Sequence, residues 1–324
     1  MTKPASTDSQ GALLAIRDPG ERPLAGLDWQ ERLARLRALL AGSGRVVVAY
    51  SGGVDSSLLL AVAHAELGER ALGVIGVSDS YAAHELALAL AQARVIGARV
   101  ETVTTGELAD PGFASNAADR CYHCKAELYR RLAQVAVREG GAQVLDGTIA
   151  DDLVDWRPGR VAAAERGVRS PLAELGFRKA DVRAAAAALG LESAGKPASP
   201  CLASRIPHGT RITRENLAQV ERAEAALRRL GFDALRVRHH GEIARVEVPV
   251  PDLPRVLAPR VRERLVAELA ALGFRWVALD LEGLRSGNMN PDLPAGTGVP
   301  APAEPGLGGM AHNSGTVTGG SGNT

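Results

Sequence analysis

The sequence is poor in aromatic residues, in cysteine and in long apolar runs, and each shortage excludes something. Phe, Trp and Tyr make up 3% of the 324 residues, so aliphatic side chains must fill any hydrophobic core. No apolar run reaches the roughly 18 residues that span a bilayer. The net charge is only +1, which gives no global indication of a nucleic-acid-binding protein. We expect a cytoplasmic protein with neither a membrane nor a nucleic acid as partner.

The three cysteines favour metal or redox chemistry over structural disulfides. Cys121 and Cys124 are separated by two residues near a predicted helix start, and Cys201 lies alone in a loop. Such a pair suits a redox dithiol, half of a zinc site or part of an iron–sulfur site, while inert packed cysteines are the alternative. A metal would need a further ligand, for which Cys201 is the obvious candidate. If Cys201 is exposed beside Arg205, its thiol would be nucleophilic. A buried structural role is equally compatible with the sequence.

A strand, a glycine turn and a helix follow one another at residues 46 to 57. Three consecutive valines predict a buried strand, and Ser51, Gly52 and Gly53 predict a sharp turn before the helix. The glycines let backbone amides approach an anion, and the helix N-terminus adds a positive dipole end. No Gly-Lys-Ser/Thr follows, so this is a phosphate loop of another kind than the Walker type. A turn without a ligand is the alternative.

Strands and helices alternate through the first half of the chain. We predict strands at residues 46–49, 71–77, 99–104 and 143–146. The alternation indicates βαβ units and a parallel sheet, which binds ligands at the carboxyl ends of its strands. Ser51, Ser78 and Asp146 fall there. The predicted fold class is α/β, with a doubly wound parallel sheet and a smaller C-terminal α+β domain.

Composition and periodicity divide the chain into four predicted parts. These are a flexible N-terminal arm at 1–28, a nucleotide-binding domain at 29–212, an α+β domain for substrate binding or oligomerisation at 213–287, and a disordered tail at 288–324. The tail is rich in glycine, proline, serine and asparagine and has no periodicity.

Two arginines alternate along a predicted strand of the C-terminal domain. Arg236 and Arg238 should face the same side of that strand. Two guanidinium groups on one face suit a phosphate, and a solvated strand face is the alternative. Arg285, near the end of the last predicted strand, could join them.

Six segments, taken together and in order, carry a family resemblance. They are Ser51-Gly-Gly-Val-Asp-Ser-Ser57, Leu145-Asp-Gly-Thr148, Asp155-Trp-Arg-Pro-Gly159, Cys201-Leu-Ala-Ser-Arg-Ile-Pro-His-Gly-Thr210, Arg236-Val-Arg-His-His-Gly241 and Leu281-Glu-Gly-Leu-Arg-Ser-Gly287. The set resembles the LarE family of ATP-dependent sulfur transferases, whose phosphate loop is the PP-loop of ATP pyrophosphatases. The resemblance implies that ATP adenylates a carboxylate of pyridinium-3,5-biscarboxylic acid mononucleotide, which becomes a thiocarboxylate for the nickel-pincer nucleotide cofactor of lactate racemase. It also implies a homo-oligomer, with a hexamer as one arrangement.

The resemblance also implies roles for individual residues. ATP would be bound by Tyr50, Ser51, Gly52, Gly53, Asp55, Ser56, Ser57, Ser78, Gly147 and Arg205. Mg²⁺ would help to hold the departing pyrophosphate, and Asp55 is the catalytic candidate for binding that metal or orienting the loop. Arg236, Arg238 and Arg285 would bind the substrate phosphate.

The cysteine count selects a branch of the family. Single-cysteine members sacrifice the cysteine that matches Cys201, which becomes dehydroalanine. Cys121, Cys124 and Cys201 resemble instead the three-cysteine branch, in which a [4Fe–4S] cluster carries the transferable sulfide. We therefore expect cluster-delivered sulfur from sulfide or another donor, with Cys201 as a catalytic residue.

Three other functions are compatible with a phosphate loop. A tRNA thiolase can also use three cysteines, but the near-neutral charge and the lack of a recognisable RNA-binding appendage speak against it. An ammonia-dependent, amide-forming synthetase gives no reason for three cysteines. A nucleotide-sensing module would bind ATP without turnover.

Overall fold

The computed structural model describes residues 24, 26–153 and 158–285. The predictions for the tail, for most of the N-terminal arm and for residues 155–157 of one motif lie outside the described residues. In the part of the chain that is described, no helix combines the length and apolar character needed to cross a membrane.

A four-stranded parallel sheet forms the centre of the larger part, in the order β3-β2-β1-β4. Its strands are β1 (Val46–Ala49), β2 (Ala71–Val77), β3 (Arg99–Thr104) and β4 (Gln143–Leu145). Val46 pairs with Ala71 of β2 on one side and with Gln143 of β4 on the other. The chain order reverses between β1 and β4, so their carboxyl ends form the switch point at which α/β sheets bind ligands.

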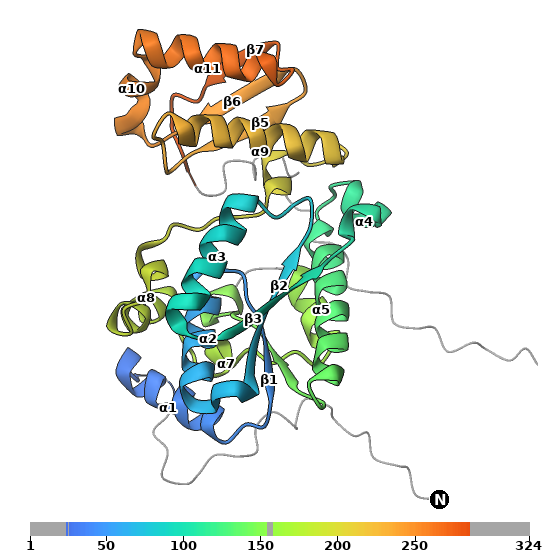
Figure 1. The fold of residues 1–324 in the computed structure, drawn as a ribbon, viewed down its shortest axis with the longest axis vertical. Helices are drawn as coiled ribbons and strands as arrows, with labels where there is room; N and C mark the ends of the chain where they lie inside the picture. Colours follow the sequence, from blue (N-terminus) through green and yellow to red (C-terminus); the bar gives the residue numbers. More distant parts are fainter. Residues whose placement is uncertain (1–23, 25, 154–157, 286–324) are drawn as a thin grey trace, which may run out of the picture.

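Helices cover both faces of this sheet (Figure 1), which confirms the predicted doubly wound α/β class. One face packs on α1 (Trp29–Ala41), α2 (Val54–Leu67), α3 (Ala83–Ile96) and α8 (Lys179–Ala188), and the other on α5 (Arg120–Arg138) and α6 (Pro158–Glu165). The alternation along β1 explains this division, since Val46 and Val48 belong to the first core and Val47 to the second.

The sequence patterns do not predict α4 (Pro111–Ala114), α6 or α7 (Pro171–Glu174). Local chemistry still explains where α4 begins. Proline occupies its first turn, where the missing amide hydrogen costs nothing. The side chain of Asp110 accepts a hydrogen bond from the amide of Gly112 at 2.8 Å.

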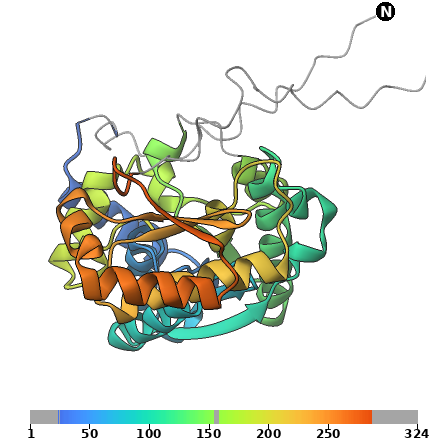
Figure 2. The ribbon, with the colours of Figure 1, turned by 90° about the horizontal axis from the view of Figure 1, so that it is seen from above.

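The C-terminal part is a three-stranded mixed sheet with helices on one face, which confirms the small α+β unit. Its elements are α9 (Arg214–Arg229), β5 (Arg236–His240), β6 (Ile243–Glu247), α10 (Leu253–Leu257), α11 (Pro259–Ala271) and β7 (Trp276–Leu279). Strands β5 and β6 are antiparallel, and β6 and β7 are parallel. The view from above shows α9 and α11 along the same side of the sheet (Figure 2).

Helix α9 joins the two parts. Leu217 and Val220, in its first half, pack into an apolar cluster with Phe113 and Leu202 of the larger part. Its second half contributes to the core of the C-terminal sheet. The opposite face of that sheet carries the alternating arginines of β5 toward the loop that contains Cys201.

Candidate functional site

The phosphate loop lies at the carboxyl end of β1, beside the switch point. Gly52 has φ +69°, and a Cβ there would lie 2.6 Å from that of Ala89, so both conformation and space require glycine. The Ser51 amide donates to Ser56 Oγ at 3.2 Å, which ties the turn to the first turn of α2. The Tyr81 hydroxyl donates to the Ser51 carbonyl at 2.9 Å. These contacts fix the turn before any ligand binds.

The N-terminus of α2 suits an anion. Gly53 is its N-cap and supplies no side-chain hydrogen bond to the first helical amides, which leaves them available to a ligand. Tyr50 and Ser57, which we predict to bind ATP, are buried. The Tyr50 hydroxyl donates to the Ala89 carbonyl at 2.9 Å, so this side chain supports the loop from the protein interior.

Asp55 forms an ion pair that the sequence does not predict. Lys179, the first residue of α8, places its Nζ 2.9 and 2.7 Å from the two carboxylate oxygens of Asp55. The pair adds a lysine cation beside the glycine turn. The two residues are 124 positions apart, so no local pattern could have revealed the contact.

Gly147 brings the end of β4 against the start of α2. A Cβ on Gly147 would lie 2.8 Å from the amide nitrogen of Ser56, so only glycine permits this approach. The preceding Asp146 is buried and accepts hydrogen bonds from the hydroxyls of Tyr129 at 2.8 Å and Ser170 at 2.7 Å. Its carboxylate therefore holds the loop in place.

Cys124 and Cys201 pack against the same apolar cluster. Cys121 is exposed and Cys124 half-buried near the start of α5, and Cys201 is the N-cap of a short 3-10 helix. Burial raises the pKa of Cys124 to about 12, and the charges of Glu107 and Cys201 add to the effect. The structure thus brings the third cysteine near the pair.

The three cysteine thiols are the candidate ligands for a metal ion or a cluster. Among the residues that the structure describes, no three His, Cys, Asp or Glu side chains converge closely enough to hold one ion. In a [4Fe–4S] cluster each cysteine binds a different iron, so three thiolates need not meet at a point. Bound metal would also stabilise the Cys124 thiolate, which burial and neighbouring negative charge disfavour.

The raised pKa of Cys124 predicts slow alkylation in metal-free protein. At pH 8 its thiolate is scarce, and the greater nucleophilicity of a high-pKa thiolate offsets only part of that deficit. We expect iodoacetamide to modify Cys124 about 30-fold more slowly than in the urea-unfolded chain, as measured by peptide mass spectrometry over time. Equal rates in folded and unfolded protein would contradict the burial described for this thiol.

Arg236 and Arg238 face the same side of β5, as predicted, and both are buried. The alternative of a solvated strand face is therefore wrong. Arg238 donates to both carboxylate oxygens of Glu247, at 3.0 and 2.8 Å, and to the carbonyl of Ser204 at 2.9 Å. Most of its hydrogen-bonding capacity is used inside the protein.

Arg236 is the better candidate for a phosphate. Within the described chain its guanidinium donates only to the carbonyl of Ala198, at 3.0 Å, and forms no ion pair. Burial, followed by the charges of Arg205 and Arg238, lowers its pKa to about 10. A bound anion would relieve both penalties.

Arg205 is bonded to the cysteine loop. Its Nε lies 2.8 Å from buried Glu224, and its Nη1 donates to the carbonyls of Pro200 and Cys201 at 2.6 and 3.2 Å. These bonds position the cysteine loop, and ATP binding by Arg205 stays a prediction. Arg285 is paired with Glu282 near the surface, and its role at the phosphate stays a prediction.

A second anchor of the cysteine loop comes from α3. Glu85 accepts hydrogen bonds from Lys196 Nζ at 2.6 Å and Ser199 Oγ at 2.7 Å. The segment before Cys201 is therefore fixed to the larger part. The segment after Cys201 is bound to the C-terminal part through Arg205 and Arg238. Sequence reasoning does not identify Glu85, because its partners are more than one hundred positions away.

Comparison with known proteins identifies the family. No family model matches the chain. The pyridinium-3,5-bisthiocarboxylic acid mononucleotide synthase of Lactiplantibacillus plantarum is 43% identical over 261 residues, which cover 80% of this chain and 94% of that protein. The chain belongs to the LarE family.

Two uncharacterized proteins also match this chain over most of its length. An uncharacterized protein of Synechocystis sp. is 45% identical over 261 residues, covering 81% of this chain and 97% of its own. A second uncharacterized protein, from Methanocaldococcus jannaschii, is 29% identical over 243 residues, which cover 75% of this chain and 91% of that protein. The predicted LarE resemblance is confirmed, and the chain is an enzyme of that family.

Proposed function

We propose that this LarE-family enzyme uses ATP to convert a carboxylate of pyridinium-3,5-biscarboxylic acid mononucleotide into a thiocarboxylate. The L. plantarum relative is named for the bisthiocarboxylic product. The observation that carries the proposal is a series of hydrogen bonds between the glycine turn and the cysteine loop. The Tyr81 hydroxyl donates to the Ser51 carbonyl of the turn, the amide of Leu202 beside Cys201 donates to the Ser80 carbonyl, and the buried Arg236 donates to Ala198 of the cysteine loop.

Activation of the carboxylate would begin at the glycine turn. A substrate carboxylate oxygen attacks the α-phosphorus of ATP, and pyrophosphate leaves. The amides at the start of α2, the hydroxyls of Ser51 and Ser56 and the Lys179 ammonium would bind the departing charge. Asp55 is the residue that would hold Mg²⁺, whose chemistry there would be further neutralisation of the pyrophosphate charge.

Sulfur transfer would follow at the cysteine loop. A sulfur nucleophile attacks the carbonyl carbon of the acyl-adenylate, AMP leaves, and a thiocarboxylate remains. Cys121, Cys124 and Cys201 would hold a [4Fe–4S] cluster, whose chemistry is to carry a transferable sulfide. Arg205 and Arg238 donate hydrogen bonds to backbone carbonyls of the loop that contains Cys201. A substrate phosphate bound at Arg236 would therefore keep the substrate at a fixed distance from the sulfur.

Substitution of Arg236 tests the phosphate site. Arg236→Ala should raise the KM for the mononucleotide about 10- to 100-fold, because a hydrogen bond to a charged group contributes about 1.5–3 kcal/mol. The Kd for ATP should not change. Pyrophosphate release at varied mononucleotide concentration measures the first quantity, and calorimetry the second.

Arg229→Ala is the matched control, since Arg229 is an exposed arginine of α9 paired with Glu268. It should leave both constants unchanged. Equal losses of ATP and mononucleotide binding in Arg236→Ala, or an unchanged KM, would contradict the assignment.

A further inference from the structure

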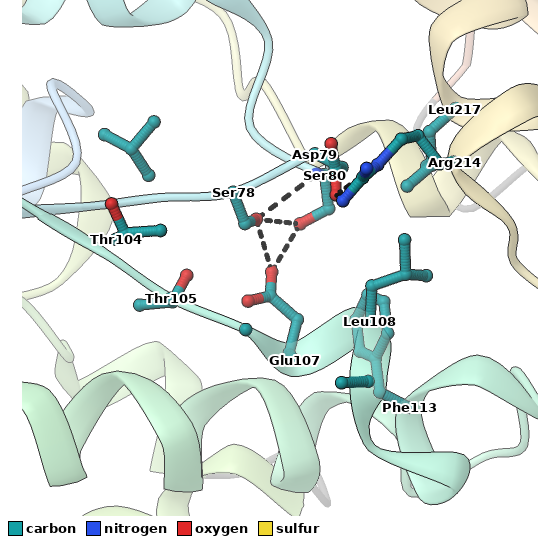
Figure 3. A pocket seen from close by; sticks show the side chains of 13 residues that line it. Ser78, Asp79, Ser80, Thr104, Thr105, Glu107, Leu108, Phe113, Arg214 and Leu217 are labelled. Atoms are coloured by element: carbon teal, nitrogen blue, oxygen red, sulfur yellow. Dashed lines mark hydrogen bonds and ion pairs between the residues drawn. The ribbon is translucent and has the colours of Figure 1, made fainter.

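A pocket lies at the carboxyl ends of β2 and β3, one strand away from the switch point, and its lining includes Ser78, which we predict to bind ATP. Its volume is about 430 Å³, which is within the range of small-molecule sites. One wall is polar and contains Ser78, Ser80 and Glu107, and the other contains Phe113 and Leu217 (Figure 3).

Glu107 is a buried carboxylate with no opposite charge. Its side chain accepts hydrogen bonds from the hydroxyls of Ser78 and Ser80 at a single oxygen, Oε1. The other oxygen, Oε2, is fully buried and has no partner, and in the described part of the chain no ion pair includes Glu107. Figure 3 shows Oε2 directed away from both serines. Arg214 and Asp79 also line the pocket, but they pair with each other. Glu107 therefore leaves one unbalanced negative charge, and because a buried carboxylate is costly without a cation, the pocket is complementary to a positively charged group.

The pocket is joined to the cysteine loop. The amide of Leu202, the residue after Cys201, donates to the carbonyl of Ser80 at 2.9 Å. Phe113 and Leu217 belong to the same apolar cluster that Cys124 and Cys201 contact. A ligand in the pocket therefore lies next to the sulfur-bearing part of the molecule.

We propose that this pocket receives the pyridinium ring of the mononucleotide and that Glu107 is a specificity residue for the positive charge of that ring. The inference rests on the proposed function and adds to it the site of the ring. A pyridinium ring is a permanent cation with flat apolar faces. Glu107 would balance the positive charge of the ring, and Phe113 and Leu217 would make apolar contacts with the ring faces.

The test compares two probes that differ in ring charge. Nicotinamide mononucleotide has a pyridinium cation, and its reduced form has an uncharged dihydropyridine ring with the same ribose phosphate. In the full-length protein, calorimetry should give at least about tenfold tighter binding of the oxidised form, because opposite charges in a partly buried site attract strongly. Glu107→Gln should reduce this ratio to near one, because it removes the negative charge of the pocket.

Two further variants make the result specific. Asp79→Asn removes another carboxylate that lines the pocket but is exposed and paired with Arg214, and it should keep the preference. Glu107→Asp retains the charge and should also keep it. Loss of the preference in Glu107→Asp as well as in Glu107→Gln would attribute the effect to packing and overturn the proposal.

The remaining outcomes separate this inference from the proposed reaction. Wild-type protein without a preference for the oxidised probe would overturn the pocket assignment, whether or not Glu107→Gln folds. A preference that depends on Glu107, in a protein that forms no thiocarboxylate, would support the pocket and defeat the proposed reaction. Thiocarboxylate formation with an unchanged preference in Glu107→Gln would defeat the pocket alone.

Discussion

Replacing Cys201 with serine should reduce thiocarboxylate formation at least about 100-fold, while ATP-dependent pyrophosphate release on the mononucleotide persists. A serine oxygen can neither supply sulfur nor replace a thiolate as a soft ligand for iron. The glycine turn and Asp55 are formed without Cys201, so activation of the carboxylate should survive. Mass spectrometry of the small-molecule product measures the first effect, and a coupled pyrophosphate assay the second.

Cys121→Ser is the companion variant, because it separates the two sulfur routes. If a cluster held by three cysteines delivers sulfide, Cys121→Ser should lose sulfur transfer and bound iron together. If Cys201 is sacrificed, Cys121→Ser should retain one turnover, and residue 201 should become dehydroalanine. Unimpaired sulfur transfer in Cys201→Ser would contradict both routes.

Arg238→Ala should lower the free energy of unfolding by about 3 kcal/mol, because it leaves a buried carboxylate without its main partner. Glu247 is fully buried and receives two hydrogen bonds from Arg238. A hydrogen bond from Arg245 to Glu247, at 3.1 Å, would remain. Urea unfolding, followed by circular dichroism, measures the change.

The double variant Arg238→Ala/Glu247→Gln provides the control for that prediction. Removing the negative charge as well should recover part of the lost stability, so the two single effects should not add. Additive effects, or a stable Arg238→Ala protein, would contradict a buried ion pair. Since loss of stability would obscure loss of substrate binding, Arg236→Ala is the better probe of the phosphate site.

Hydrophobic periodicity was sufficient to predict the sheet. The valines of β1 and the alternating helices indicate a parallel sheet, and the glycine turn marks its functional edge. The short helices α4 and α7 lack this signal, because four residues are too few to form a periodic pattern and tertiary packing stabilises them.

The sequence was sufficient to predict candidate site residues that stand in motifs, but not the residues that contact and position them. Asp55 and Cys201 stand in recognisable motifs, whereas Lys179 and Glu85 act through contacts with residues more than one hundred positions away. The alternation of Arg236 and Arg238 predicts that they share a face. Only the packing of β5 against the cysteine loop shows that this face is buried.

The most direct test of the account is a mass spectrum of the products after anaerobic incubation with ATP, Mg²⁺, sulfide and pyridinium-3,5-biscarboxylic acid mononucleotide. We predict AMP, pyrophosphate and a mononucleotide in which a carboxylate oxygen has been replaced by sulfur. Pyrophosphate release without a sulfur-containing product, or ATP left intact beside the mononucleotide, would contradict ATP-driven sulfur transfer by this chain.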